Sequence, residues 1–170
     1  GARPRARGDA AADHGARAPE GPRRGDGGKL VCFQGLADDR TGKRAPCNIV
    51  SVGVGGDPGK PPDFRFEMDI HRRMPHCNID VYDGTNFGRG AITNAPRFIK
   101  FHAENFHQHT WQRYANTQVD IFKIDCEGCE FVAVPPFLAN VRTTQMLVER
   151  HGNRAVDVVS QLMGKLNESH

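Results

Sequence analysis

Residues 119–131, VDIFKIDCEGCEF, contain two sets of side chains that can do chemistry. An apolar run ends at Asp125 and Glu127, a pattern typical of a buried strand with carboxylates at its end. The same stretch contains Cys126 and Cys129, and this C-x-x-C spacing occurs in metal sites and in redox pairs. Two carboxylates at a strand end favour a ligand with a positive charge and disfavour a phosphate, because like charges repel. A different function follows from each pair.

The cysteine pair lacks the usual companions of a metal or redox site. A structural zinc site needs further Cys or His ligands at a matching spacing, but there is no second C-x-x-C, and His107 and His109 form a lone H-x-H in a polar stretch. A thioredoxin-like pair opens a long helix, whereas the prolines at 135–136 predict an interruption after about two turns. The sequence therefore favours Cys126 and Cys129 as small, partly buried side chains at a strand-to-helix turn.

The elements that would position these residues alternate along the chain. Residues 63–74 and 154–170 place apolar side chains at roughly helical spacing. Strands that alternate with helices predict an open, mostly parallel α/β sheet with helices on both faces. In such sheets, ligands bind beyond the carboxyl ends of the strands, near the point where the strand order reverses. The predicted strands are residues 47–54, 78–84, 97–104, 119–125 and 144–150.

The ends of the first two predicted strands suit a nucleoside. Gly53, Gly55 and Gly56 allow a tight turn and a close approach of the backbone to a ligand. The dinucleotide fingerprint G-x-G-x-x-G fails, because Pro58 stands where its third glycine should be. Asp83, at the end of the second strand, can accept hydrogen bonds from both hydroxyls of a ribose or can cap the turn that follows it. Beside a glycine-rich strand end, the ribose interpretation is favoured.

The fourth strand is expected to lie beside the first, across the switch point. Its acidic end, with Asp125 and Glu127, suits an electropositive cofactor that carries a ribose, which points to S-adenosylmethionine rather than to a dinucleotide. Glu127 has a second interpretation, because an acidic residue near the start of a helix is stabilised by the helix dipole. Glu104, at the end of the third strand, is a further candidate for cofactor binding.

Residues 1–28 differ in composition from the rest of the chain. They contain no Val, Ile, Leu, Met, Phe, Tyr or Trp and are rich in arginine. Such a segment cannot bury enough apolar surface to offset the entropy of ordering it, so we expect a disordered tail before a single domain at 29–170. Acidic residues interrupt the arginines, which favours a linker over a nucleic-acid-binding arm or a transit peptide. No nucleic-acid partner is expected, and no apolar stretch is long enough to span a membrane.

The cysteine count also bears on the compartment. The chain has five cysteines at irregular spacing, and an odd number argues against a disulfide framework. The sequence therefore favours reduced cysteines and a reducing, intracellular compartment.

Four segments within residues 47–152 resemble the FkbM-type methyltransferases, and in particular their eukaryotic methyltransferase-like branch. The segments are IVSVGVGGD, HCNIDVYDGT, VDIFKIDCEGCEF and MLVERHG. The corresponding family patterns read approximately VYSFGIGxD, CxVxxFDPT, LKIDIEGAEW and ExH. The segment of the fourth strand is the most specific. The chain departs from the patterns at Gly84, where Pro is usual, and at Phe131, where Trp is usual.

This resemblance implies a class I methyltransferase fold, which is Rossmann-like, with S-adenosylmethionine as the cofactor. It implies that Asp83 holds the ribose and that Glu149 and His151 lie near the acceptor. It also implies that the terminal antiparallel strands of this fold are missing, so that 29–170 would be an incomplete domain. The residues implied to line the methionine end are Gly53, Gly55 and Asp57, and those implied at the acidic edge are Asp125, Glu127 and Glu130.

The activity expected from these features is methyl transfer to the hydroxyl of a small molecule or a glycan. His151 is the candidate general base, oriented by Glu149 or Asp125. A helix-capping or merely polar role for His151 stays open. Two alternatives to the enzyme also stay open: a cofactor-binding module without catalysis, and a redox or metal protein that uses Cys126 and Cys129.

Overall fold

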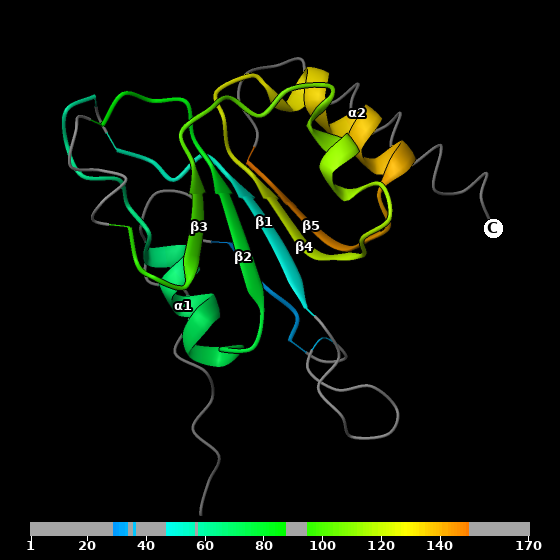
Figure 1. The fold of residues 1–170 in the computed structure, drawn as a ribbon, viewed down its shortest axis with the longest axis horizontal. Helices are drawn as coiled ribbons and strands as arrows, with labels where there is room; N and C mark the ends of the chain where they lie inside the picture. The colour runs from blue at the N-terminus through cyan, green and yellow to red at the C-terminus, as the bar shows by residue number, and fades with distance from the viewer. Residues whose placement is uncertain (1–28, 34–35, 37–46, 57, 88–94, 150–170) are drawn as a thin grey trace, which may run out of the picture.

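The computed structural model of the chain describes residues 29–33, 36, 47–56, 58–87 and 95–149. These residues form a parallel sheet with helices on opposite faces (Figure 1). The predicted tail at 1–28 and the predicted helix at 154–170 lie outside the described residues, as do Asp57 and His151.

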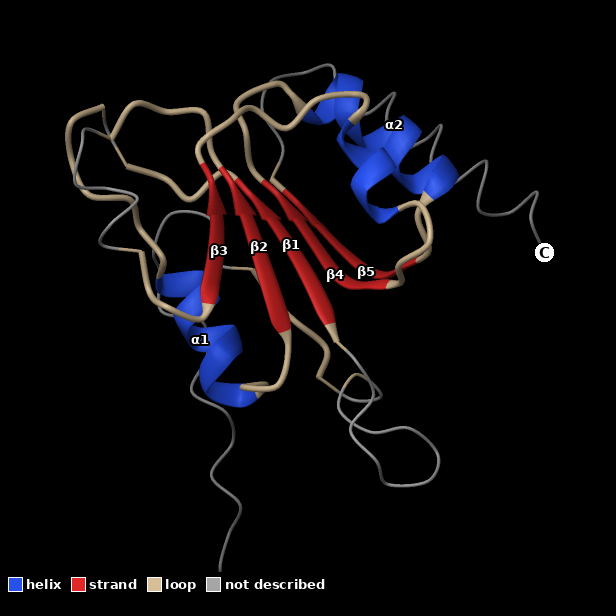
Figure 2. Ribbon diagram, viewed as in Figure 1, coloured by secondary structure: helices blue, strands red, loops and turns tan. Residues whose placement is uncertain are grey.

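All five predicted strands are present, and each neighbouring pair runs parallel. The order in the sheet is β3-β2-β1-β4-β5, so the strand order reverses between β1 and β4, as expected. The carboxyl ends of the strands therefore gather at one edge, which Figure 2 shows at the top of the sheet. We refer to it as the carboxyl edge. The bounds are β1 Asn48–Val52, β2 Asn78–Tyr82, β3 Ile99–His102, β4 Val119–Ile124 and β5 Thr143–Val148.

The central strands form because they are buried on both faces. All six residues of β4 are buried, and β4 pairs with β1 on one side and β5 on the other. A parallel strand covered on both faces has a nearly continuous apolar run, which is what VDIFKI supplies except at Asp120 and Lys123.

Within the described residues, three helical segments connect the strands. The predicted helix at 63–74 is confirmed as α1 (Arg65–Arg73), and a 3-10 turn, η1 (Thr110–Tyr114), precedes β4. The helix α2 (Glu130–Asn140) follows β4 and lies on the other side of the sheet from α1 (Figure 1). The prediction that the prolines at 135–136 interrupt this helix is wrong, because α2 continues through both of them.

The buried face of α2 explains why the prolines do not end it. Ala133, Val134 and Phe137 are almost fully buried, and the Phe137 ring stacks on Phe122 of β4 with ring centroids 4.1 Å apart. Each proline removes one backbone N–H donor from the helix. The packing of this apolar face against the sheet outweighs that loss, so tertiary contacts override the local preference.

The sheet separates two hydrophobic cores. Phe64, Ile70 and Met74, in and beside α1, pack on the face that carries Ile49 and Ile121. On the opposite face, α2 and η1 cover a second cluster, which comprises Val50, Val52, Tyr82, Phe106, Tyr114, Val119, Phe122, Ile124, Ala133, Val134, Phe137 and Val141.

The cysteines correct the expectation of reduced thiols. Disulfides join Cys47 to Cys77 and Cys126 to Cys129, which leaves Cys32 as the free cysteine. The odd count led to the wrong expectation because one cysteine lies outside the pairing. The first disulfide follows from the sheet, since Cys47 and Cys77 directly precede two paired strands and their Cα atoms are 4.5 Å apart. Disulfides are typical of oxidising compartments, so the preference for a reducing compartment loses its support.

Among the residues that the structure describes, no helix has both the length and the apolar character needed to cross a membrane.

The core of the α2 face can be tested with two substitutions in one helix. Phe137→Ala removes a fully buried ring and is expected to lower the free energy of unfolding by about 3–5 kcal/mol. Val132→Ala alters a side chain that is 58% exposed, so the free energy of unfolding is expected to change by no more than about 0.5 kcal/mol. Urea unfolding measures both values. Similar losses for the two variants would mean that α2 does not pack as described.

Candidate functional site

The carboxyl edge brings the ends of β1, β2 and β4 together. The N–H of Gly53 donates to the carbonyl of Tyr82 at 2.9 Å, and the N–H of Asp125 donates to the carbonyl of Val52 at 2.9 Å. These bonds extend the strand pairing by one residue and place the glycine turn, residues 53–56, between Asp83 and Asp125. The sequence predicted this juxtaposition, and the structure confirms it.

Gly53 is required by both its backbone conformation and its surroundings. Its φ is +77°, and a Cβ atom at this position would lie 1.6 Å from the carbonyl oxygen of Asp125. Gly55 also has a positive φ, +69°, but a Cβ there would meet no atom within 4 Å. The close contact at Gly53 thus lets β1 and β4 end side by side, while the turn at Gly55 borders open space.

Asp83, which follows the second strand, binds the glycine turn through its carboxylate. Its Oδ2 accepts the N–H of Val54 at 2.9 Å, and its Oδ1 accepts the N–H of Thr85 at 2.7 Å. The turn-capping role is therefore present in the structure. Each carboxylate oxygen has a further lone pair, so these two bonds leave acceptor capacity for a ligand.

Asp125 and Glu149 lie together at the ends of β4 and β5, and both contact Lys29. The Lys29 ammonium forms an ion pair with Glu149 and lies 3.5 Å from Oδ2 of Asp125. Burial, followed by a hydrogen bond with Glu149, raises the pKa of Asp125 above its ordinary value. Lys29 was not predicted as part of this edge, because nothing in its local sequence pattern links it to residues about a hundred positions away.

A network of buried charged side chains supports the glycine turn from the α1 face of the sheet. Lys123, the residue before the last of β4, donates to the carbonyl of Gly53 and is only 6% exposed. On the same side, Oε1 of Glu67 in α1 accepts the Ser51 hydroxyl at 2.5 Å. Burial lowers the pKa of Lys123 and raises that of Glu67, and attraction between the two groups opposes both shifts. The sequence offered one signal for this network, namely a charged residue, Lys123, within the mostly apolar run VDIFKI.

Three further acidic candidates follow β3 or β4 in the chain, and two of them have a local role. Glu104 follows β3, and its carboxylate accepts from the guanidinium of Arg113 in η1, which lowers the pKa of Glu104. Glu130 is 3% exposed, and its Oε2 accepts the N–H of Gly128 at 2.8 Å, so it braces the turn that leads into α2. Glu127 is exposed in that turn, with φ +54°.

A separate cavity of about 210 Å³ lies on the η1 face of the sheet, away from the glycine turn. Asp80, Lys100 and Arg113 contribute to its lining. Asp80 also accepts from His102 at 2.6 Å and lies 3.5 Å from the Lys100 ammonium, so its charge is already compensated. The carboxyl edge, where the predicted residues converge, remains the candidate site.

Comparisons with known proteins do not assign the chain to a family. No protein-family model matches it, and no solved structure matches it at a significant level. It is 33% identical over 76 residues to the chaperone protein HtpG of Salinispora tropica. This similarity covers 45% of the chain but only 12% of the chaperone, so the chain spans about an eighth of that protein's length.

The close contact at Gly53 leads to a paired test. Gly53→Ala is expected to cost roughly 4 kcal/mol or more in the free energy of unfolding, because the new methyl group collides with the Asp125 backbone. Gly55→Ala meets only the left-handed backbone penalty of about 1–2 kcal/mol. Urea unfolding distinguishes them, and equal costs would show that β1 and β4 do not approach each other as described.

The buried Glu67 predicts a pH dependence that Glu67→Gln should remove. Its folded-state pKa is raised, so its contribution to stability is full below its unfolded value of about 4.5 and is lost as the pH rises through the folded value. The free energy of unfolding of the wild type, relative to that of the variant, should therefore fall above about pH 4.5. Urea titrations from pH 4 to pH 8, for both proteins, measure this difference. A constant difference would mean that burial does not control the charge of Glu67.

Proposed function

We propose that the chain binds S-adenosylmethionine at the carboxyl edge and transfers its methyl group to a hydroxyl acceptor, as an FkbM-type methyltransferase. The observation that supports this most is the hydrogen bond that the Asp83 carboxylate accepts from the glycine turn. The segments that carry the resemblance are far apart in the sequence, yet Gly53, Asp83 and Asp125 meet at one edge of an open α/β sheet. An open parallel sheet of this kind is compatible with a Rossmann-like fold, in which ligands bind at this edge.

The residues at this edge fit the cofactor. The Asp83 carboxylate retains one acceptor position on each oxygen after it binds the turn, which suits the two vicinal hydroxyls of a ribose. The open space beside Gly55 gives a ligand room to approach the backbone. Asp125 and Glu149 provide negative charge for a cationic group, although Lys29 offsets part of it and must share these carboxylates with the ligand.

The protein's part in the proposed reaction is mainly alignment. When bound, S-adenosylmethionine supplies an activated methyl group on a sulfonium. The chain positions the ribose through Asp83 and the adjoining group through the glycine turn, so that an acceptor hydroxyl can approach in line. In the proposed reaction, Glu149, which follows β5, orients a general base that takes the hydroxyl proton, and His151 is the proposed base.

The ribose assignment is tested at Asp83. Asp83→Ala should weaken binding of S-adenosylmethionine by about tenfold to a hundredfold, because two charge-assisted hydrogen bonds of about 1.5–3 kcal/mol each are lost and water replaces part of them. Asp83→Asn should lose less, since its carbonyl oxygen still accepts. Calorimetry with S-adenosylmethionine, and with NAD as the competing cofactor, measures affinity and selectivity.

Asp69→Asn is the matched control for this experiment. Asp69 is an exposed carboxylate of α1 that pairs with Arg72, and its change should leave the affinity unaltered. Because Asp83 also holds the Val54 N–H, a thermal melt of each variant must accompany the titration. Unchanged affinity in a folded Asp83→Ala protein would remove the ribose assignment, and tighter binding of NAD would replace the proposed cofactor.

A cofactor-binding module without transfer is the second candidate, and the Lys29 contact favours it. The Lys29 ammonium engages Asp125 and Glu149, the two carboxylates that would orient the base. The two candidates separate when the chain is incubated with S-adenosylmethionine and a panel of sugars and small alcohols. Formation of S-adenosylhomocysteine together with a methyl ether supports the enzyme, whereas tight binding without either product supports the module.

A further inference from the structure

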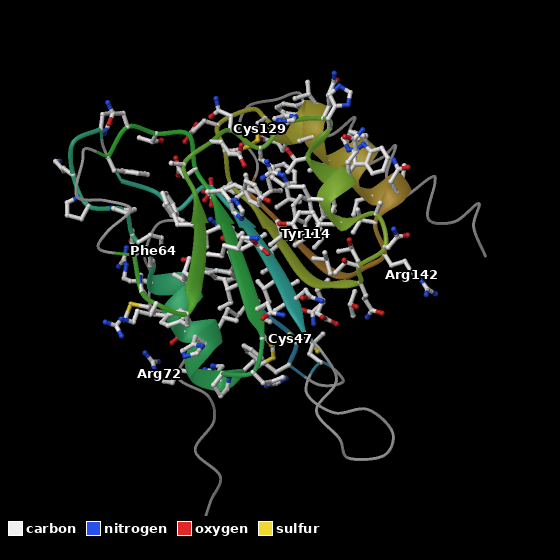
Figure 3. The ribbon with its side chains drawn as sticks, in the orientation of Figure 1. Cys47, Phe64, Arg72, Tyr114, Cys129 and Arg142 are labelled. Carbon is white, nitrogen blue, oxygen red and sulfur yellow. A yellow bond between two sulfur atoms is a disulfide. The ribbon has the colours of Figure 1, made fainter. Side chains whose placement is uncertain are left out.

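The turn between β4 and α2 has a combination of features that the proposed methyl transfer does not use. Cys126 and Cys129 are both partly buried and form a disulfide immediately before Glu130, the first residue of α2. Figure 3 shows Cys129 at the carboxyl edge, at the opposite end of the sheet from Cys47. The helix that follows has eleven residues, and its N-terminal dipole stabilises a thiolate at this position.

A buried carboxyl group lies against the disulfide. Oε2 of Glu130 is 3.3 Å from Sγ of Cys126 and accepts the N–H of Gly128 at 2.8 Å. Glu130 is only 3% exposed, so its side chain is held between the turn and the apolar α2 core. A carboxyl group fixed next to a sulfur is placed to exchange a proton with it, which a disulfide with a purely structural role does not require.

The two disulfides differ in how much they stabilise the fold. The bond from Cys47 to Cys77 links two strands across 30 residues, and both cysteines are buried. The bond from Cys126 to Cys129 spans only three residues. Because the unfolded-state entropy that a disulfide removes grows with the length of the closed loop, the shorter bond stabilises the fold less. Partly exposed disulfides are also the more readily reduced ones.

The backbone of this turn is also unusual. Glu127 has φ +54° and is the only described residue other than glycine with a positive φ, and Gly128 follows with φ +114°. A residue with a side chain is held in this region at a cost, and such residues cluster at functional sites.

We propose that Cys126 and Cys129 form a thiol–disulfide exchange site for external thiols and dithiols, independent of the cofactor site. In the reductive direction, the thiolate of a dithiol attacks Sγ of Cys129, and the bond between the two cysteines breaks. Cys126 leaves with the electron pair and takes a proton, and Glu130 is placed to deliver it. The second thiol of the reductant then attacks the mixed disulfide and releases Cys129, which is protonated in turn. The protein gains two electrons and two protons, and the dithiol becomes a disulfide.

The first experiment measures which disulfide opens. The full chain, with Cys32→Ser to remove the free thiol, is equilibrated in dithiothreitol buffers of increasing reducing strength, quenched with an alkylating reagent and analysed by mass spectrometry. The pair at 126 and 129 is expected to be reduced in buffers that leave the pair at 47 and 77 intact. Reduction of both pairs together, or resistance of the C-x-x-C until the protein unfolds, would overturn the proposal.

The second experiment tests the role of Glu130. The Cys32→Ser chain, reduced only at Cys126 and Cys129, is mixed with oxidised glutathione, and loss of these two thiols is followed over time from pH 6 to pH 9. Glu130→Gln keeps an acceptor for the Gly128 N–H but cannot exchange the proton, so the rate should fall by roughly tenfold or more and its pH profile should change. An unchanged rate and profile in a variant with an unchanged thermal melt would remove Glu130 from the mechanism and overturn the assigned site.

A third measurement separates this proposal from the cofactor assignment. In the Cys32→Ser chain, which has no free thiol, the double variant Cys126→Ala, Cys129→Ala should lose all exchange with oxidised glutathione. It should still bind S-adenosylmethionine within about tenfold of the parent chain, or roughly 1.4 kcal/mol. Exchange that persists in this variant would overturn the redox site, whatever the cofactor affinity. Failure of the wild type to bind S-adenosylmethionine would count against the proposed function alone, since the exchange assay requires no cofactor.

Discussion

The close contact between Gly53 and the Asp125 backbone is the constraint on which the carboxyl edge depends. A Cβ atom at Gly53 would lie 1.6 Å from the Asp125 carbonyl oxygen, so the ends of β1 and β4 can adjoin only if this residue is glycine. That contact sets the position of the glycine turn, to which Asp83 then binds through the Val54 N–H. Without it, the residues from three strands would not form one site.

Buried charge supports the same turn from the α1 side. Lys123 donates to the Gly53 carbonyl from inside the sheet, and Glu67 and Ser51 lie on the same face. A buried ammonium is costly unless it is hydrogen-bonded and near an opposite charge, and both conditions are met here. The network therefore links the helix α1, the centre of the sheet and the backbone that borders the proposed cofactor site.

The carboxyl edge also accommodates two chemistries side by side. Asp83 and the glycine turn form the proposed cofactor side, between β1 and β2, whereas the C-x-x-C lies beyond β4 at the start of α2. Glu130 serves the second of these, because its carboxyl group faces Cys126 and the Gly128 N–H. The family resemblance implied a cofactor role for Glu130, but its burial within the turn favours a role toward the disulfide.

Hydrophobic runs and strand-end residues are local signals, and they predicted the strands and the position of β4 beside β1. They also predicted that Gly53, Asp83 and Asp125 converge at one edge. Other features could not be read from local patterns and emerged in the folded chain. They are the disulfides, the continuity of α2 through Pro135 and Pro136, and the partners of Asp125 and Glu149. The physical reason is common to these cases. A disulfide between neighbouring strands, a helix stabilised by its buried face and an ion pair with Lys29 all depend on which distant residues lie close in space, and no local pattern encodes that distance.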